Sequence, residues 1–126
     1  DNNENRILLS AFGACEVVVL SLERFMTTCS VAEQCALAIG SLAFNNTVNS
    51  ERLGAVGACV LLVTSMVRHH DSDVIAEVVC RAICALSSQH DQLEAAGACA
   101  AVVTALTKHA KSEPVARWGC RAVYCL

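Results

Sequence analysis

Nine cysteines and four histidines offer the most chemistry in this chain of 126 residues. Cys80 and Cys84 are four residues apart, so on a helix their thiols would share a face and could ligate a metal together. However, no Cys-x-x-Cys pair occurs, and Cys84 is matched elsewhere in the sequence by Gly40 and Tyr124. The run His69-His70-Asp71 falls at a predicted helix end, where a cation or a partly packed ring explains it more simply. We therefore expect no metal site and no cofactor.

Patterns for catalysis are absent from the sequence as well. No nucleophile stands beside an obvious base, and the glycines of Gly54-Ala55-Val56-Gly57 lack the Lys and Ser/Thr that follow in a phosphate-binding loop. We expect no enzyme activity. Redox sensing through Cys29, in an expected loop, or through Cys125 is an alternative, and it would require a lowered thiol pKa.

The cysteine count, the charge and the hydropathy favour a reducing compartment. An odd number of cysteines, three of them at equivalent positions (Cys15, Cys59 and Cys99), suits small buried side chains better than a disulfide framework. The acidic start is unlike a secretory signal, and the uncharged stretch between Arg52 and Arg68 is too short to span a bilayer. A net charge of −3 favours neither a nucleic-acid nor a membrane partner. We expect a cytoplasmic or nuclear protein.

An internal repeat organises these residues. Gly-Ala-Cys occurs at Gly13, Gly57 and Gly97, and 25 residues after each glycine stand Ala38, Ala82 and Ala122. The glycines are 44 and then 40 residues apart, and a period of that length is typical of helical repeat proteins.

Each repeat contains three stretches with helical spacing. A short first stretch (6–12, 52–56 and 92–96) stops at the glycine, which can take up the left-handed conformation of a sharp corner. The second stretch has an apolar stripe beginning at the repeated cysteine. The third begins near Ser30, Asp73 and Ser112, which we expect to be the amino-terminal caps. The third stripe contains the repeated alanine together with Ile39, Ile83 and Val123. Residues 43–50, rich in asparagine, are expected to form a longer loop between repeats.

This arrangement resembles the armadillo repeat, in which a short helix ends in glycine and two longer helices follow. The resemblance covers the whole chain and implies an all-α, right-handed α-solenoid, with repeats at about 4–44, 49–88 and 89–126 of one domain. Two-helix HEAT repeats are the nearest alternative, and the glycine-ended first helix argues against them. Because neither end carries a polar capping repeat, we expect the chain to belong to a longer array.

In armadillo proteins the third helices line a concave groove that binds extended peptides. Carried over position by position, this groove contains Glu33, Leu37 and Ser41, then Glu77, Arg81 and Ala85, then Arg117, Arg121 and Cys125. Where peptide-gripping members have Trp and Asn, this chain has Leu37, Arg81 and Arg121, and Ser41, Ala85 and Cys125, respectively. The amide ladder that would hold a peptide main chain is thus absent from the sequence.

Three arginines suggest what takes its place. We expect Arg81, Arg117 and Arg121 to form a basic pocket for an acidic partner segment, with Glu77 paired to Arg81 at i, i+4. The alternative is that they are solvated arginines with local partners such as Glu113. Trp118 is either an exposed binding anchor or an aromatic packed against a following repeat.

The resulting prediction is a protein-interaction scaffold that binds a partner segment in this groove. The alternative is an architectural segment that associates end to end through its apolar terminal faces.

Overall fold

The computed structural model describes residues 2–126, and within that range the chain contains nine α-helices and one 3₁₀ turn, with no strand. The predicted all-α class is therefore confirmed. The elements are α1 (Asn2–Ala11), α2 (Ala14–Arg24), α3 (Cys29–Ala43), α4 (Thr47–Ala55), α5 (Ala58–Arg68), α6 (Asp73–Ala85), η1 (Ser87–Gln89), α7 (His90–Ala95), α8 (Ala98–Lys108) and α9 (Glu113–Cys125).

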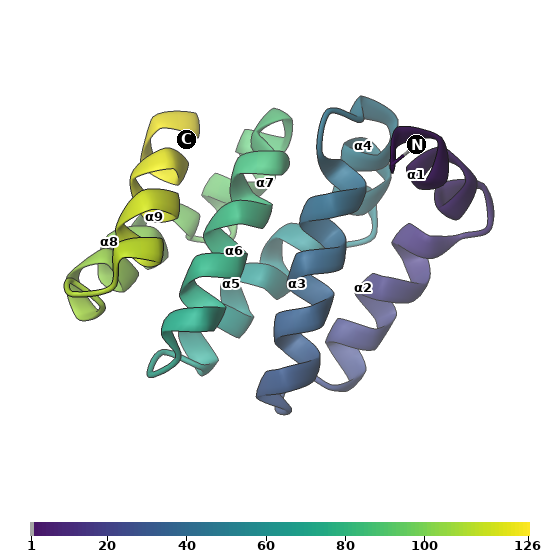
Figure 1. The fold of residues 1–126 in the computed structure, drawn as a ribbon. Helices are drawn as coiled ribbons and strands as arrows, with labels where there is room; N and C mark the ends of the chain where they lie inside the picture. Colours follow the sequence, from purple (N-terminus) through teal and green to yellow (C-terminus); the bar gives the residue numbers. More distant parts are fainter. Residues whose placement is uncertain (1) are drawn as a thin grey trace.

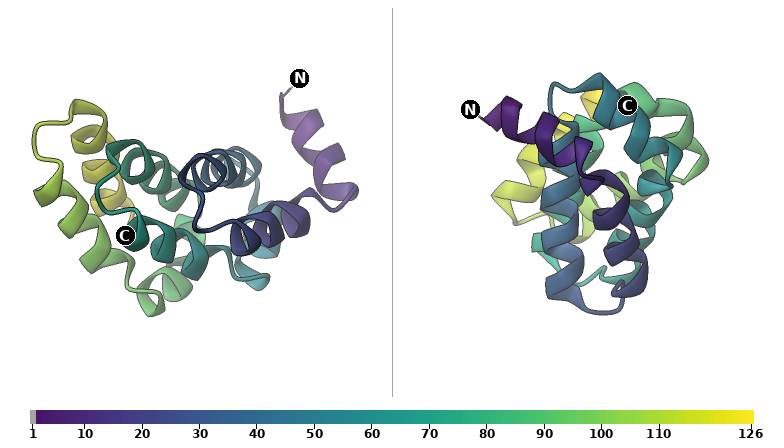
Figure 2. Two further views of the ribbon diagram at one scale, coloured as in Figure 1. Left: turned by 90° about the horizontal axis from the view of Figure 1, so that it is seen from below. Right: turned by 90° about the vertical axis from the view of Figure 1, so that its right-hand side faces the viewer.

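The helices form three consecutive groups of three, α1 to α3, α4 to α6 and α7 to α9. The last helix of each group lies beside that of the next, so that α3 packs on α6 and α6 on α9 (Figure 1). A second row contains α2, α5 and α8, each in contact with its neighbour in the row. The first and last helices lie at opposite ends of the molecule, and α1 stands apart from the other helices in the view from below (Figure 2).

Three glycines make the corner between the first and second helix of each group. Gly13, Gly57 and Gly97 have φ values of 84°, 91° and 85°, in the left-handed region, as predicted. At Gly57 and Gly97 an added Cβ would meet no atom within 4 Å. Glycine is therefore favoured at these two corners by backbone conformation rather than by lack of space.

The third helices begin close to the predicted residues. Ser72 and Ser112 are the capping residues of α6 and α9, and their hydroxyl oxygens accept hydrogen bonds from the backbone N–H groups of Ile75 (3.1 Å) and Val115 (3.4 Å). The predicted caps Asp73 and Ser30 are wrong, because Ser72 caps α6 and Thr28 is the capping residue of α3. The expected loop position of Cys29 is wrong, because this residue is the first of α3.

The expected long loop over residues 43–50 is also wrong in its second half, because α4 begins at Thr47. Asn46 caps α4 by accepting a hydrogen bond from the backbone N–H of Asn49 (2.9 Å). The buried Asn49 side chain donates in turn to the carbonyl oxygen of Leu42, also at 2.9 Å. The asparagines thus satisfy the polar ends of two successive helices, which shortens the connection between them.

The core runs continuously through all three groups, but equivalent positions are not equally buried. Cys15 and Cys59 are buried whereas Cys99, predicted to match them, is exposed. Val103 and Val123 are 58% and 53% exposed, although their counterparts Val63 and Ile83 lie in the core. The exposed members of these sets lie on α8 and α9, the last two helices of the described residues, whereas their counterparts lie on helices that contact a further group. At the opposite end, Ala38 is half-buried while Ala82 and Ala122 are fully buried.

Arginine 52 joins the first two groups through polar contacts. Its guanidinium donates to Glu16 Oε1 from Nε (3.1 Å) and from Nη2 (2.7 Å). Its Nη1 donates to the carbonyl oxygen (2.8 Å) and the hydroxyl oxygen (2.6 Å) of Ser10. This contact lowers the pKa of the Glu16 carboxyl group, with the hydrogen bonds from Arg52 as the main cause.

Within residues 2–126 no single helix has both the length and the hydropathy to cross a membrane. The consecutive pairs α1 with α2 and α4 with α5 meet that criterion only when joined across bends of 76° and 71°.

Candidate functional site: an arginine-lined groove

A hollow of about 1390 Å³ runs across α3, α6 and α9, and we call it the arginine groove. Seven of the nine predicted groove residues line it, namely Leu37, Ser41, Arg81, Ala85, Arg117, Arg121 and Cys125. Glu33 and Glu77 are not among the lining residues. The groove extends beyond the prediction to Arg6, Phe44 and the start of α4.

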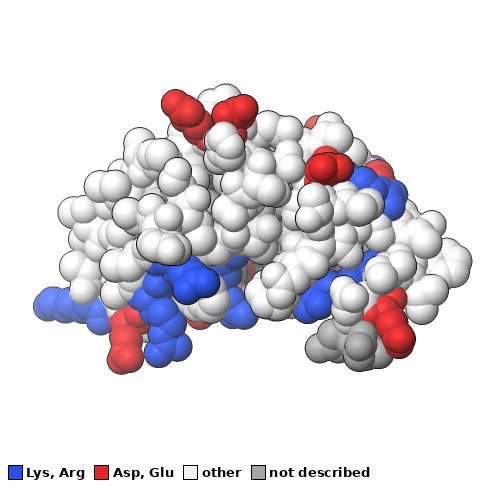
Figure 3. All heavy atoms as spheres, turned by 90° about the horizontal axis from the view of Figure 1, so that it is seen from above, with Lys and Arg blue, Asp and Glu red and all other residues white. Residues whose placement is uncertain are grey.

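The groove wall carries positive charge only. Its described lining includes four arginines, Arg6, Arg81, Arg117 and Arg121, and neither Asp nor Glu. In Figure 3 most of the Lys and Arg side chains lie along the lower edge of the molecule, with some Asp and Glu beside them, and much of the remaining surface is uncharged. A hollow whose charges all have one sign concentrates the field on a bound segment of opposite sign.

Arg81 is positioned by an aromatic ring, not by the predicted carboxylate. Its guanidinium carbon lies 5.0 Å from the centre of the Trp118 ring, one helix away on α9. No ion pair joins Glu77 to Arg81 in the described structure, so that prediction is wrong. Stacking on an indole holds a guanidinium in place and leaves its N–H groups free to bind an anion. Trp118 is half-buried and packs against the core, so it supports Arg81 rather than standing out as an exposed anchor.

Arg117 and Arg121 lie one turn apart on α9 and are both exposed. The alternative local partner exists, since Arg117 Nη2 lies 3.8 Å from Glu113 Oε1, but the two side chains are 70% and 88% exposed. An ion pair so exposed contributes little free energy, so a partner segment can compete for Arg117. No described carboxylate lies within ion-pair distance of Arg121.

Arg6 brings a cation to the far end of the groove, and the repeat pattern gave no signal for it. Its guanidinium carbon lies 5.5 Å from the centre of the Phe44 ring. The Nε atom of Arg6 is buried and has no hydrogen-bond partner among the described residues. The equivalent positions in the other groups are Ser50 and His90, so only the tertiary structure relates Arg6 to the other arginines.

Three thiols, those of Cys84, Cys120 and Cys125, lie in the wall of the groove. Burial, and after it the neighbouring Cys125 thiol, raise the pKa of Cys84 to about 12. Cys29, the other candidate for redox chemistry, is half-buried with its Sγ 3.5 Å from Glu33 Oε1. Among the described residues no group of three or more His, Cys, Asp or Glu side chains is placed to hold a metal ion.

The histidines at the ends of α5 and α8 connect neighbouring groups. His69 Nε2 lies 2.6 Å from the backbone oxygen of Met26, and His109 Nε2 lies 2.9 Å from that of His70. A carbonyl oxygen only accepts hydrogen bonds, so each ring is the donor. The sequence contained the signal, because the two histidines occupy equivalent positions. They are partly packed rings, which was one of the two predicted alternatives, and they contact the preceding group.

Comparison with known proteins adds no relative. No protein-family model, curated protein or solved structure matches this chain.

Proposed function

We propose that the chain is an armadillo-like α-solenoid and acts as a protein-interaction scaffold whose arginine groove binds an acidic partner segment. Three glycine corners at equivalent positions and the row formed by α3, α6 and α9 support the fold assignment. The observation that carries the function is the composition of the groove, which has four arginines and no carboxylate among its described lining residues. This role requires no catalytic group and no cofactor.

The contacts indicate how binding would work. Arg81, held against Trp118, and Arg121, without a described ion-pair partner, would provide guanidinium N–H groups for paired hydrogen bonds to carboxylates. Apolar side chains of the partner would contact Leu37, Ala85 and the rest of the small-residue wall. Recognition would then depend on the partner's side chains rather than on its main chain, and affinity would fall as salt concentration rises.

A peptide array tests this proposal. The array varies the number of Asp and Glu in a constant apolar background and includes matched Gln peptides, and the selected peptides are then measured by fluorescence anisotropy. We expect acidic peptides to bind and the double variant R81E/R121E to weaken binding by about a hundredfold, since each desolvated charge contact is worth about tenfold or more. The charge-reversal control is R68E, at the exposed end of α5 outside the groove. Equal effects of R68E and R81E/R121E, or equal binding of Gln and Glu peptides, would contradict the proposal.

The exposed end faces support a second candidate function, end-to-end self-association. Cys99, Val103 and Val123 occupy positions whose counterparts are buried by the next group, so the first group of another copy can cover them. Light scattering over a range of concentrations tests this. V103E should keep the protein monomeric, whereas V60E, at a 51% exposed valine of α5, should not. A monomer at all concentrations would exclude self-association.

A further inference from the structure

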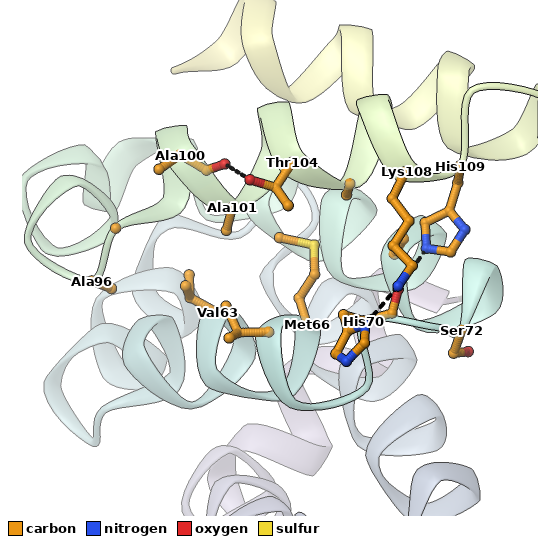
Figure 4. A pocket seen from close by; sticks show the side chains of 14 residues that line it. Val63, Met66, His70, Ser72, Ala96, Ala100, Ala101, Thr104, Lys108 and His109 are labelled. Carbon is orange, nitrogen blue, oxygen red and sulfur yellow. Dashed lines mark hydrogen bonds between the residues drawn. The ribbon is translucent and has the colours of Figure 1, made fainter.

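A cavity of about 400 Å³ lies between α5 and α8 and shares no lining residue with the arginine groove. Its floor consists of buried apolar side chains, among them Val63, Met66, Ala101 and Ala105 (Figure 4). Ala100 and Thr104 form one wall on α8. Ligand cavities in proteins have volumes of about 300–1000 Å³ and are mostly apolar, and an apolar cavity of only about 150 Å³ already binds benzene.

Comparison of equivalent helices explains the cavity. Ala101 on α8 matches Leu61 on α5, which is half-buried and packs against the core at the preceding junction. Ala100 likewise matches the larger Val60, although Val60 is itself 51% exposed. Two alanines therefore leave space at a contact where the chain's own repeat carries larger residues.

One end of the cavity is polar and contains an ion pair. Lys108 Nζ donates to His70 Nδ1 (2.7 Å) and to Asp71 Oδ1 (2.6 Å), and this contact lowers the pKa of Asp71. An ammonium group has three N–H donors, so one remains for a ligand. Asp71 is 84% exposed and contacts Lys108 from the solvent side. A ligand carboxylate in the cavity can therefore bind Lys108 without displacing Asp71 from it. His109 fixes this end by its hydrogen bond to the His70 backbone.

We propose that this cavity binds a small amphiphile with an apolar body and a carboxylate head. The body would fill the space beside Ala101 and Met66, and the head would accept the third hydrogen bond of Lys108. This site is separate from the arginine groove and does not depend on the function proposed for it.

The two methionines of the chain provide the experiment, because Met66 lies in the cavity and Met26 lies at the other junction. With ¹³C-labelled methionine methyl groups, octanoate should shift the NMR signal of Met66 and leave that of Met26 unchanged. Octan-1-ol, with the same chain and no charge, should bind about tenfold more weakly. K108M keeps the hydrocarbon stem and should reduce octanoate binding to the level of octanol.

A101L restores the residue of the equivalent helix and should weaken octanoate binding at least about tenfold. Its matched control is T107L, which adds a leucine at an exposed position of α8 outside the cavity and should bind octanoate normally. The proposal is overturned if A101L binds as the unaltered chain does, if neither probe binds, or if Met26 and Met66 shift together. A change of oligomeric state on A101L would instead assign the cavity to contact between copies. If A101L fails to fold, the test rests on the unaltered chain, in which octanoate should shift the signal of Met66 and leave that of Met26 unchanged.

Discussion

Replacing Gly57 by alanine should destabilise the protein by about 1 kcal/mol, which corresponds to a fall in Tm of about 4 °C. At a φ of 91°, an L-residue pays about 1–2 kcal/mol for the left-handed conformation. Alanine also has less conformational freedom than glycine in the unfolded chain, and this offsets about 0.4–1 kcal/mol of that cost. An added Cβ meets no atom within 4 Å, so no steric cost is added and the net value follows from the backbone alone.

Urea unfolding followed by circular dichroism measures this free energy, and two variants test its origin. G57N should cost less than G57A, because asparagine adopts the left-handed conformation more readily than alanine. G40A is the matched control. Gly40 lies inside α3, where alanine favours the helix by up to about 1 kcal/mol, and its Cβ would make a tolerable 3.4 Å contact with Ala82 Cα. The reasoning is refuted if G57A is as stable as the unaltered chain, or if G40A is the more damaging of the two substitutions.

Two further predictions follow from the contacts. R52M should destabilise the protein by about 1 kcal/mol, an estimate reduced because the pair with Glu16 is partly exposed. In the folded protein the pKa of Glu16 is lowered from 4.5, so the stability that this contact adds is fully present above about that pH and is lost as pH falls through the folded pKa. In acid unfolding, the difference in stability between R52M and the unaltered chain should therefore shrink over that pH range. Iodoacetamide at mildly alkaline pH should modify the exposed Cys99 well before Cys80 and Cys84, whose pKa values burial raises to about 12, and mass spectrometry of the digested protein would show the order. Early modification of Cys80 would mean that α6 opens readily.

The arrangement of helices was largely readable from the repeat. Three glycines at matching positions predicted three corners, and all three have the left-handed conformation. The errors lie where one repeat joins the next. The asparagines at residues 46 and 49 suggested a loop. Instead, the Asn46 side chain caps the start of α4, and the Asn49 side chain binds a carbonyl oxygen at the end of α3. Side-chain capping of this kind needs both helix ends in place, so composition alone suggests a turn.

The groove was predicted in outline because helical periodicity places residues four apart on one face. The contacts and positions of its charged residues were not predicted, because Arg81 contacts Trp118 on another helix and Arg6 comes from α1. The i, i+4 rule considers only neighbours on the same helix. It could not take account of an aromatic ring that packing brings against Arg81 from another helix.

The sequence by itself determined the class of fold, the corners and the helical faces, because these depend on local backbone preference and on spacing along one chain. Only the tertiary structure decided that Cys99 is exposed while Cys59 is buried, and that Ala101 leaves a cavity where Leu61 packs against the core. Burial depends on what lies opposite a residue, and identical positions in successive repeats face different neighbours.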